Sequence, residues 1–190
     1  VYLTNSLEES HPDTGTLFAN WLSSEANEAN HIKRDTPVMC VIGNPPYSVS
    51  STNKNDWIEN LISDYKQNLN ERNIQPLSDD YIKFIRYGQH FVQKNGSGIL
   101  DYISNNSFID GLIHRQMRRQ LLESFDKIYI LDLHGNAKKK ETSQDGSSDQ
   151  NVFDIMQGVS INIFVKTGKK KKNEFSEVYA LDLFGKRQYK

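Results

Sequence analysis

The sequence has a single cysteine, Cys40, which excludes a disulfide framework and a zinc site built from cysteines. Within its apolar surroundings, Cys40 is expected to be a small buried hydrophobe of a cytosolic protein. No apolar run reaches the roughly 18 residues of a membrane-spanning helix, so none is expected. The net charge of -1 excludes the global basic field that would attract nucleic acid to the whole domain.

Glycine-rich loops are also missing after the predicted strands. No segment of the Phe-x-Gly-x-Gly kind follows a strand, and no acidic residue ends a second strand where it could hold a ribose. The Gly96-Ser97-Gly98 segment precedes a strand, which is the wrong order for a loop that cradles a cofactor. Nuclease and helicase signatures and a target-recognition region are absent as well. A complete cofactor pocket is therefore not expected within these residues.

The 190 residues suffice for one domain, although the mean hydropathy of -0.67 predicts long loops or a missing part of the core.

The strand patterns at 127–133 and 158–166 are joined by a long polar loop without helical periodicity, so we expect these two strands to be antiparallel neighbours. The whole pattern predicts an α/β fold whose parallel strands end in an antiparallel hairpin. Periodicity predicts helices over 16–34, 57–65, 78–92 and 111–125, and strands over 1–4, 38–42, 99–104, 127–133, 158–166 and 178–183.

The run from Val38 to Ile42 is continuously apolar, as is typical of a strand buried on both faces of a parallel sheet. Pro45 and Pro46 end it, because proline lacks an N–H and fixes φ. Open α/β sheets place ligand sites beyond the carboxyl ends of their strands. We therefore expect an interior strand whose carboxyl edge presents Asn44, two rigid carbonyls and the ring of Tyr47.

Asn44-Pro45-Pro46-Tyr47 resembles motif IV of the amino-group methyltransferases, and the resemblance implies that these four residues are catalytic. An amine conjugated to a ring is a poor nucleophile because its lone pair is delocalised. The Asn44 side-chain oxygen and the Pro45 carbonyl can each accept one N–H of that amine and stabilise the positive charge that develops during methyl transfer. Tyr47 supplies a π-face for a planar substrate. The alternative is that the tetrapeptide is only a strand-ending turn.

Two further segments resemble motifs of the adenine methyltransferases. Thr4-Asn5-Ser6-Leu7 is similar to motif III, in which an acidic residue reads the adenine of S-adenosyl-L-methionine. Asn5 stands at that position here and can still accept a hydrogen bond from an amino group. The resemblance implies that Asn44 also contacts this cofactor. Asn151-Val152-Phe153, followed by a strand, resembles motif VIII and implies that Phe153 stacks on the target base opposite Tyr47.

The segments Leu3 to Glu8, Val41 to Tyr47 and Leu133 to Asn136 together resemble the fused restriction–modification polypeptides of the type IIG and type I single-polypeptide kinds. This resemblance implies a Rossmann-like methyltransferase sheet and assigns residues 1–190 to the substrate-side part of a class I S-adenosylmethionine-dependent domain. A strand at residues 1–4 and a polar C-terminal end without a capping element lead us to expect a chain cut at both ends. The implied partners are an upstream cofactor-binding half and nuclease and target-recognition regions of the same prokaryotic, cytoplasmic polypeptide, with no membrane.

The resemblance further implies double-stranded DNA as substrate, with a flipped adenine methylated at N6. Flipping a base costs a few kcal/mol, and stacking worth about 1–3 kcal/mol per base offsets much of that cost.

The basic residues that are candidates for DNA contacts are Lys138, Lys139, Lys140, Arg115, Arg118 and Arg119. The alternative for the three arginines is that they form a solvated helix face without a ligand. His114 is expected on the same polar side of that helix and is given no role.

Two alternatives remain open from the sequence. Protein-glutamine and RNA-guanine methyltransferases share the tetrapeptide, but they would not need the second aromatic residue or the lysine-rich loops. The chain could instead be a non-catalytic fragment that docks DNA or neighbouring domains. A glycine-rich motif upstream would favour an enzyme. Because this chain lacks such a loop, the isolated 190 residues are expected to bind S-adenosylmethionine weakly or not at all.

Overall fold

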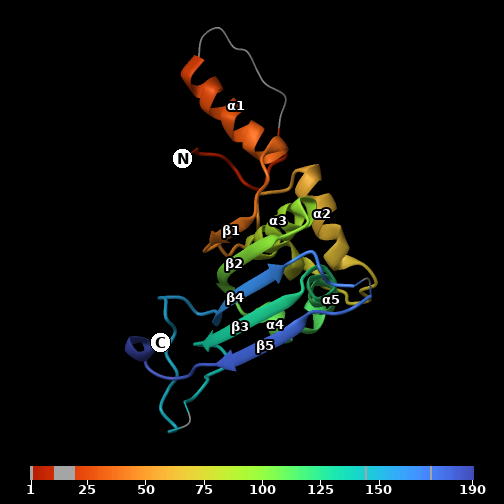
Figure 1. Cartoon of the computed structure of the whole chain (residues 1–190). Coiled ribbons are helices and arrows are strands. Elements are labelled where there is room, and N and C mark those ends of the chain that lie inside the picture. The colour runs from red at the N-terminus through yellow and green to blue at the C-terminus, as the bar shows by residue number, and fades with distance from the viewer. Residues whose placement is uncertain (1, 11–19, 144, 172) are drawn as a thin grey trace.

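One mixed sheet with strand order β1-β2-β4-β3-β5 organises the computed structural model, which describes residues 2–10, 20–143, 145–171 and 173–190 (Figure 1). β1 is parallel to β2, β4 is antiparallel to both β2 and β3, and β3 is parallel to β5. The predicted α/β class and the antiparallel β3–β4 pair are therefore confirmed. The strands are β1 (Cys40–Gly43), β2 (Gly98–Asn105), β3 (Lys127–His134), β4 (Val159–Lys166) and β5 (Glu177–Asp182).

Polar caps define where the two long helices under the sheet begin. Asn55 precedes α2, and its side-chain oxygen accepts the N–H of Ile58 at 3.1 Å. Asp79 caps α3 in the same way, and Gly96 ends that helix with φ +83°, a conformation that glycine adopts at no steric cost. The helices are α1 (Asn20–Asp35), α2 (Asp56–Lys66), α3 (Asp80–Asn95), α4 (Ser107–Asp110) and α5 (Arg115–Ser124), with short 3₁₀ turns at Gln75–Ser78, Leu112–His114 and Arg187–Tyr189.

The core lies between one face of the sheet and the helices α2, α3 and α5 (Figure 1). Leu100 of β2 and Phe164 of β4 point into it and are fully buried. Gly88 of α3 permits the close packing of helix on sheet, because a Cβ there would lie 2.4 Å from a methyl carbon of Leu100. We call this side of the sheet the covered face.

The opposite face of the sheet, which we call the open face, carries large apolar side chains that no helix in the described ranges covers. Tyr129 of β3 and Tyr179 of β5 stack there with ring centroids 5.0 Å apart. A shallow apolar hollow of about 350 Å³ extends around these two rings. The most exposed members of the open face are Ile42, Ile99, Tyr129, Tyr179 and Leu181.

Three predictions about the first part of the chain are wrong. Within the described residues β1 is an edge strand that pairs only with β2, so the predicted interior position is not observed. Its open-face residue Ile42 is 74% exposed, because no described element covers that side. Cys40 is exposed for the same reason. Residues 2–4 form no strand. The first helix begins at Asn20, and the part of its predicted range at 16–19 lies outside the described residues.

None of the helices in the described part of the chain is both long and apolar enough to cross a membrane. In Figure 1, α1 extends away from the sheet beyond β1. Its link to the rest of the domain includes the Lys33 ammonium, which donates to the Asn5 carbonyl at 2.7 Å, and the Arg34 carbonyl, which accepts from Lys94 at 2.7 Å. These contacts hold α1 to the turn at Asn5 and to the end of α3.

Candidate active site at the carboxyl edge of the sheet

The Asn-Pro-Pro-Tyr segment directly follows the carboxyl end of β1, as its sequence predicts. Asn44 is exposed, so its amide is free to meet a substrate, whereas Pro45 is buried and holds its carbonyl in a fixed place. Tyr47 is half-buried and packs against the core. The segment thus combines an accessible amide with a rigid support.

The Tyr47 ring is fixed by an edge-on contact with Tyr81 of α3, with ring centroids 6.0 Å apart. Its hydroxyl is buried, and no described residue hydrogen-bonds to it. Burial, together with the nearby charge of Asp79, raises the pKa of Tyr47 to about 12. The phenol is therefore neutral at physiological pH, and the feature that Tyr47 offers to a ligand is its ring.

The residue after the tetrapeptide is clamped to the first turn of α3. The Ser48 N–H donates to an Asp79 carboxylate oxygen at 2.7 Å, and the Ser48 carbonyl accepts the Asp80 N–H at 3.3 Å. Burial raises the pKa of Asp79, although the N–H groups of Ser48 and Tyr81 oppose that shift. Helix α3 thus fixes the chain on the far side of the tetrapeptide.

Asn5 lies in a turn that contacts the loop following the tetrapeptide. Its amide nitrogen donates to the Asn53 side-chain oxygen at 3.2 Å and to Glu8 at 3.0 Å, and its oxygen accepts the Leu7 N–H at 3.1 Å. The Asn55 amide nitrogen adds a bond of 2.8 Å to the Leu7 carbonyl. The structure therefore connects the motif III-like turn to residues 53–55, as a shared site requires.

A second polar loop at this edge comes from β2, and the sequence reasoning assigned its residues no role. Asn105 and Asn106 are both buried, and the Asn106 N–H donates to the Gly158 carbonyl at 3.0 Å. A Cβ at Gly158 would lie 2.6 Å from the Asn106 amide, so this contact requires glycine. The run of Ser and Asn immediately after the predicted strand was the available signal.

Phe153 lies in the segment just before Gly158. The bond between Asn106 and Gly158 holds that segment beside the carboxyl end of β2. The buried Asn151 amide spans the segment, donating to the carbonyls of Gly135 at 3.0 Å and Gln157 at 2.6 Å, while its oxygen accepts the Phe153 N–H at 2.8 Å. Phe153 itself is half-buried. Among ring contacts of the described residues, Tyr47 pairs with Tyr81 and not with Phe153. The two rings share the carboxyl edge without touching.

The lysine run between β3 and β4 is exposed at this edge. The Lys139 ammonium pairs with Asp110, the last residue of α4, at 3.0 Å. Lys138 and Lys140 are exposed on either side of it. This placement leaves their ammonium groups accessible to an anionic ligand.

The three arginines of α5 are engaged within the domain. Arg115 forms a two-pronged pair with Glu71, and Arg119 pairs with Glu123 at 2.8 Å. Arg118 donates to the carbonyls of residues 108 and 111 at 2.8 and 2.7 Å. The DNA contacts of these three arginines stay a prediction, and their bonds within the domain do not favour it.

His114 is not on the polar side of its helix, as the sequence suggested, but is 5% exposed. Neither ring nitrogen has a hydrogen-bond partner among the described residues. Burial, reinforced by the positive charge of Arg118, lowers the pKa of His114 to about 4. It is therefore a neutral core residue.

Asp132, His134 and Asp182 place potential metal-ligand atoms within 4.8 Å of one another at the ends of β3 and β5. These groups already satisfy each other, because the His134 ring bonds to Asp182 at 2.8 Å and lies 3.5 Å from Glu141. Asp182 is also largely open to solvent. We assign this cluster to ion pairing between loop and strand.

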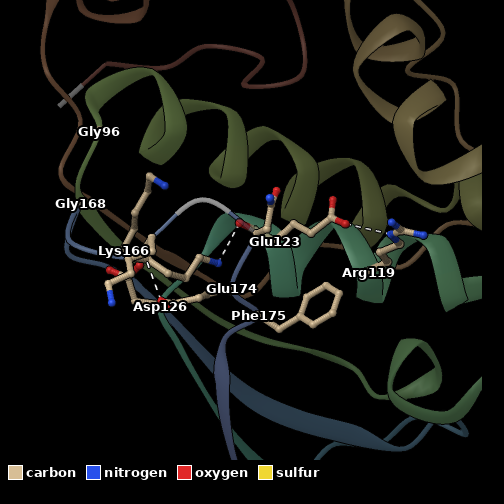
Figure 2. A pocket seen from close by; sticks show the side chains of 11 residues that line it. Gly96, Arg119, Glu123, Asp126, Lys166, Gly168, Glu174 and Phe175 are labelled. Carbon is tan, nitrogen blue, oxygen red and sulfur yellow. Dashed lines mark hydrogen bonds and ion pairs between the residues drawn. The ribbon is translucent and has the colours of Figure 1, made fainter.

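A hollow of about 610 Å³ lies at the opposite edge of the sheet, where β4 ends and β2 and β3 begin (Figure 2). Two of its charged side chains have partners within the domain. Arg119 pairs with Glu123, as Figure 2 shows, and the Lys166 ammonium donates to the Ser124 carbonyl at 2.9 Å. This hollow has no part in the candidate site, because every motif residue lies at the other edge.

Solved structures with the same fold come from much longer proteins. The chain is 27% identical to the ATP-dependent Type ISP restriction-modification enzyme LlaBIII bound to DNA, with a TM-score of 0.77, over 96% of this chain and 12% of that one. It is 28% identical to DrdV in a DNA complex, with a TM-score of 0.67, over 86% of this chain and 16% of that one. A nuclease-deletion mutant of the Type ISP enzyme LlaGI with a DNA substrate mimic, at 23% identity and a TM-score of 0.69, shares the fold over 86% of this chain and 16% of its own.

No protein with a curated description matches the chain. The family model described as Eco57I restriction-modification methylase, however, matches residues 3–139. That range includes the turn at Asn5, the tetrapeptide at 44–47 and the buried loop after β2. The chain therefore belongs to the Eco57I restriction-modification methylase family.

Proposed function

We propose that this chain is the target-amine side of a DNA methyltransferase that methylates the N6 amino group of a flipped adenine within a restriction–modification protein. One observation carries the proposal. In a member of a methylase family, Asn44 is exposed at the carboxyl end of β1, between a strand and a segment that α3 holds in place. This is the arrangement that two fixed acceptors for one amine require.

In the proposed reaction, the Asn44 side-chain oxygen and the Pro45 carbonyl accept the two N–H groups of the adenine amine. The methyl donor, S-adenosylmethionine, supplies an electrophilic methyl group on a sulfonium sulfur. The amine nitrogen gives its electron pair to that methyl carbon while the carbon–sulfur bond breaks and its electrons stay on sulfur. The nitrogen then releases one proton to solvent. Asn44 and Pro45 contribute by stabilising the positive charge on nitrogen before that proton leaves.

The residues present fit part of a cofactor site. The Asn5 oxygen accepts one N–H from Leu7 and keeps a second lone pair for the adenine amine of the donor. Asn44, which follows β1, is the second residue that we propose contacts the donor. The remainder of the pocket is assigned to the upstream part of the parent polypeptide, because no glycine-rich loop follows a strand here.

We also propose that Tyr47 and Phe153 become the two walls of the base slot when DNA binds. The rings do not touch in the free chain, so the segment at 151–157 has to move towards Tyr47. A fluorescent adenine analogue at the target position reports the stacking. Phe153→Ala should restore the fluorescence of the unstacked base, whereas Phe153→Trp should keep it quenched. Unchanged fluorescence in Phe153→Ala would remove Phe153 from the slot.

Exposed Lys138 and Lys140 are proposed to contact DNA phosphates, and Lys139 supplies the internal comparison because Asp110 already neutralises it. Each phosphate contact contributes about 0.9 to the slope of the logarithm of DNA affinity against the logarithm of salt concentration. Lys138→Ala and Lys140→Ala should each reduce that slope by about 1, and Lys139→Ala should reduce it less. Equal slopes in all three variants would contradict these contacts.

Product identification tests the proposed function. The full-length parent is incubated with methyl-labelled S-adenosylmethionine and, in separate reactions, with duplex DNA, RNA or protein. The products are digested to nucleosides or peptides for mass spectrometry. We expect the label in N6-methyladenine. Label in a cytosine, in RNA guanine or in protein glutamine would replace the proposed substrate, and no transfer to any acceptor would support a non-catalytic docking fragment.

A further inference from the structure

A lysine buried beneath the site has no role in the reaction described above. Lys83 of α3 is 0% exposed, yet it carries a charge that burial makes costly unless it is paired. Its ammonium donates to the Ser51 hydroxyl at 3.2 Å, to the Asn53 carbonyl and to Glu59 at 2.9 Å. Two of these three partners lie in the loop that follows the tetrapeptide. Lys83 therefore fixes the path of that loop.

Asp80, on the first turn of the same helix, holds the same two loop residues through their side chains. One carboxylate oxygen accepts from the Ser51 hydroxyl at 2.5 Å and from the Asn53 amide nitrogen at 3.1 Å. Because the Asn53 nitrogen is committed to Asp80, the Asn53 oxygen must face the other way. That oxygen accepts from the Asn5 amide nitrogen at 3.2 Å.

This chain of bonds determines how the Asn5 amide is oriented. Both of its N–H groups are used, one by Asn53 and one by Glu8, whose side chain is exposed. Its oxygen faces the Leu7 N–H and keeps a free lone pair. An acidic residue at this position would present oxygen in either orientation, whereas an amide presents oxygen only if something holds it. Of the two acceptors, Asn53 and Glu8, only Asn53 is bonded to the buried residues Asp80 and Lys83.

We propose that Lys83, Asp80 and Asn53 are positioning residues that hold the Asn5 oxygen outward as a hydrogen-bond acceptor. They thereby make the cofactor site selective for a purine with an exocyclic amine. The inference rests on the proposed function, because it assigns Asn5 to the adenine of the methyl donor. It goes further in naming the interior residues that set the polarity of that contact.

The test uses the full-length parent and two ligands that differ at one position of the purine. S-adenosylhomocysteine carries the 6-amino group, and S-inosylhomocysteine carries a 6-oxo group that needs a donor instead. Calorimetry gives the ratio of their affinities. Asn53→Ala and Lys83→Met should each lower the preference for adenine by about tenfold, since each frees the Asn5 amide to turn. Lys54→Met, which removes an exposed lysine from the same loop, should leave the ratio unchanged.

A purely structural role would lower thermal stability without changing this ratio, so a wild-type ratio in both variants would overturn the inference. If Lys83→Met does not fold, Asn53→Ala decides alone, because Asn53 is only half-buried in a loop. In the double variant the loss should match that of a single variant, since the residues act in series. Wild-type protein that binds neither ligand would instead refute the proposed function, and a wild-type preference that survives in the variants refutes only the positioning role.

Discussion

The two faces of the sheet differ although the strands that form them look alike in sequence. Leu100 and Ile99 are neighbours in β2, yet Leu100 on the covered face is 0% exposed and Ile99 on the open face is 41% exposed. Side chains alternate along a strand, so an apolar run describes both faces at once. A continuously apolar strand pattern therefore predicts a sheet that is covered on both faces, whereas the helices in the described part of the chain cover only one face.

The candidate site depends on the covered face. Tyr47 packs against Tyr81 of α3, and Ser48 is bonded to the cap residue Asp79 of that helix. Helix α3 also holds the loop that reaches Asn5. The side of the sheet with a full core is therefore the side that positions the tetrapeptide, and the open face contributes no residue to it.

The largest expected difference between the faces is in stability. Leu100→Ala should lower the free energy of unfolding by about 2–5 kcal/mol, because it leaves a cavity against Gly88 and α3. Ile99→Ala, one residue away on the open face, should cost less than about 1 kcal/mol. Urea unfolding of the two variants measures both values. Equal losses would show that the open face is buried in solution.

The second effect concerns pH and the buried His114. Because burial keeps its imidazole neutral in the native state, the unfolded chain binds more protons between pH 6.5 and about 4. The stability that the neutral ring permits is therefore present above pH 6.5 and is lost as the pH falls to about 4. The shift corresponds to roughly 3 kcal/mol.

We expect His114→Leu to reduce the loss of unfolding free energy between pH 6.5 and 4 relative to wild type, with little cost at pH 7. Replacing Asn60, an exposed residue of α2, by leucine removes no titratable group, so this control should keep the pH dependence of wild type. Urea unfolding at several pH values gives the comparison. A His114→Leu profile parallel to wild type would mean that the imidazole reaches water.

The smallest effect is expected for Tyr47→Phe. The Tyr47 hydroxyl is buried without a partner among the described residues, so its removal breaks no hydrogen bond seen there and leaves the packing against Tyr81 intact. The free energy of unfolding should change by less than about 0.5 kcal/mol, and methyl transfer by the parent should persist because the π-face remains. A tenfold loss of transfer would assign the hydroxyl a role that the free chain does not display.

The sequence predicted the structure best where the chemistry of a few neighbouring residues restricts the backbone conformation. Pro45 and Pro46 had to end a strand, so the order of residues alone was enough to place the tetrapeptide at a carboxyl edge. The absence of a helical pattern between 134 and 158 likewise predicted the antiparallel β3–β4 pair. Both predictions rest on backbone geometry, which a short stretch of residues determines.

Features that depend on distant residues could not be predicted. The edge position of β1 depends on which strands are present to pair with it, and the exposure of Ile42 and Cys40 follows from the same cause. Lys83 looks like an ordinary polar residue of an amphipathic helix until the loop at 51–53 folds over it. Asn5 became interpretable only when its partner Asn53 was known.

The central claim is that Asn44 accepts a hydrogen bond from the amine that receives the methyl group. The direct measurement is single-turnover methylation of duplex DNA by the full-length parent, with N6-methyladenine quantified by mass spectrometry, for Asn44→Ala beside Asn60→Ala, an exposed asparagine of α2. Asn44→Ala should lower the rate of transfer at least about 100-fold with unchanged circular dichroism, and Asn60→Ala should retain the wild-type rate. Undiminished N6-methyladenine formation by Asn44→Ala would contradict the account.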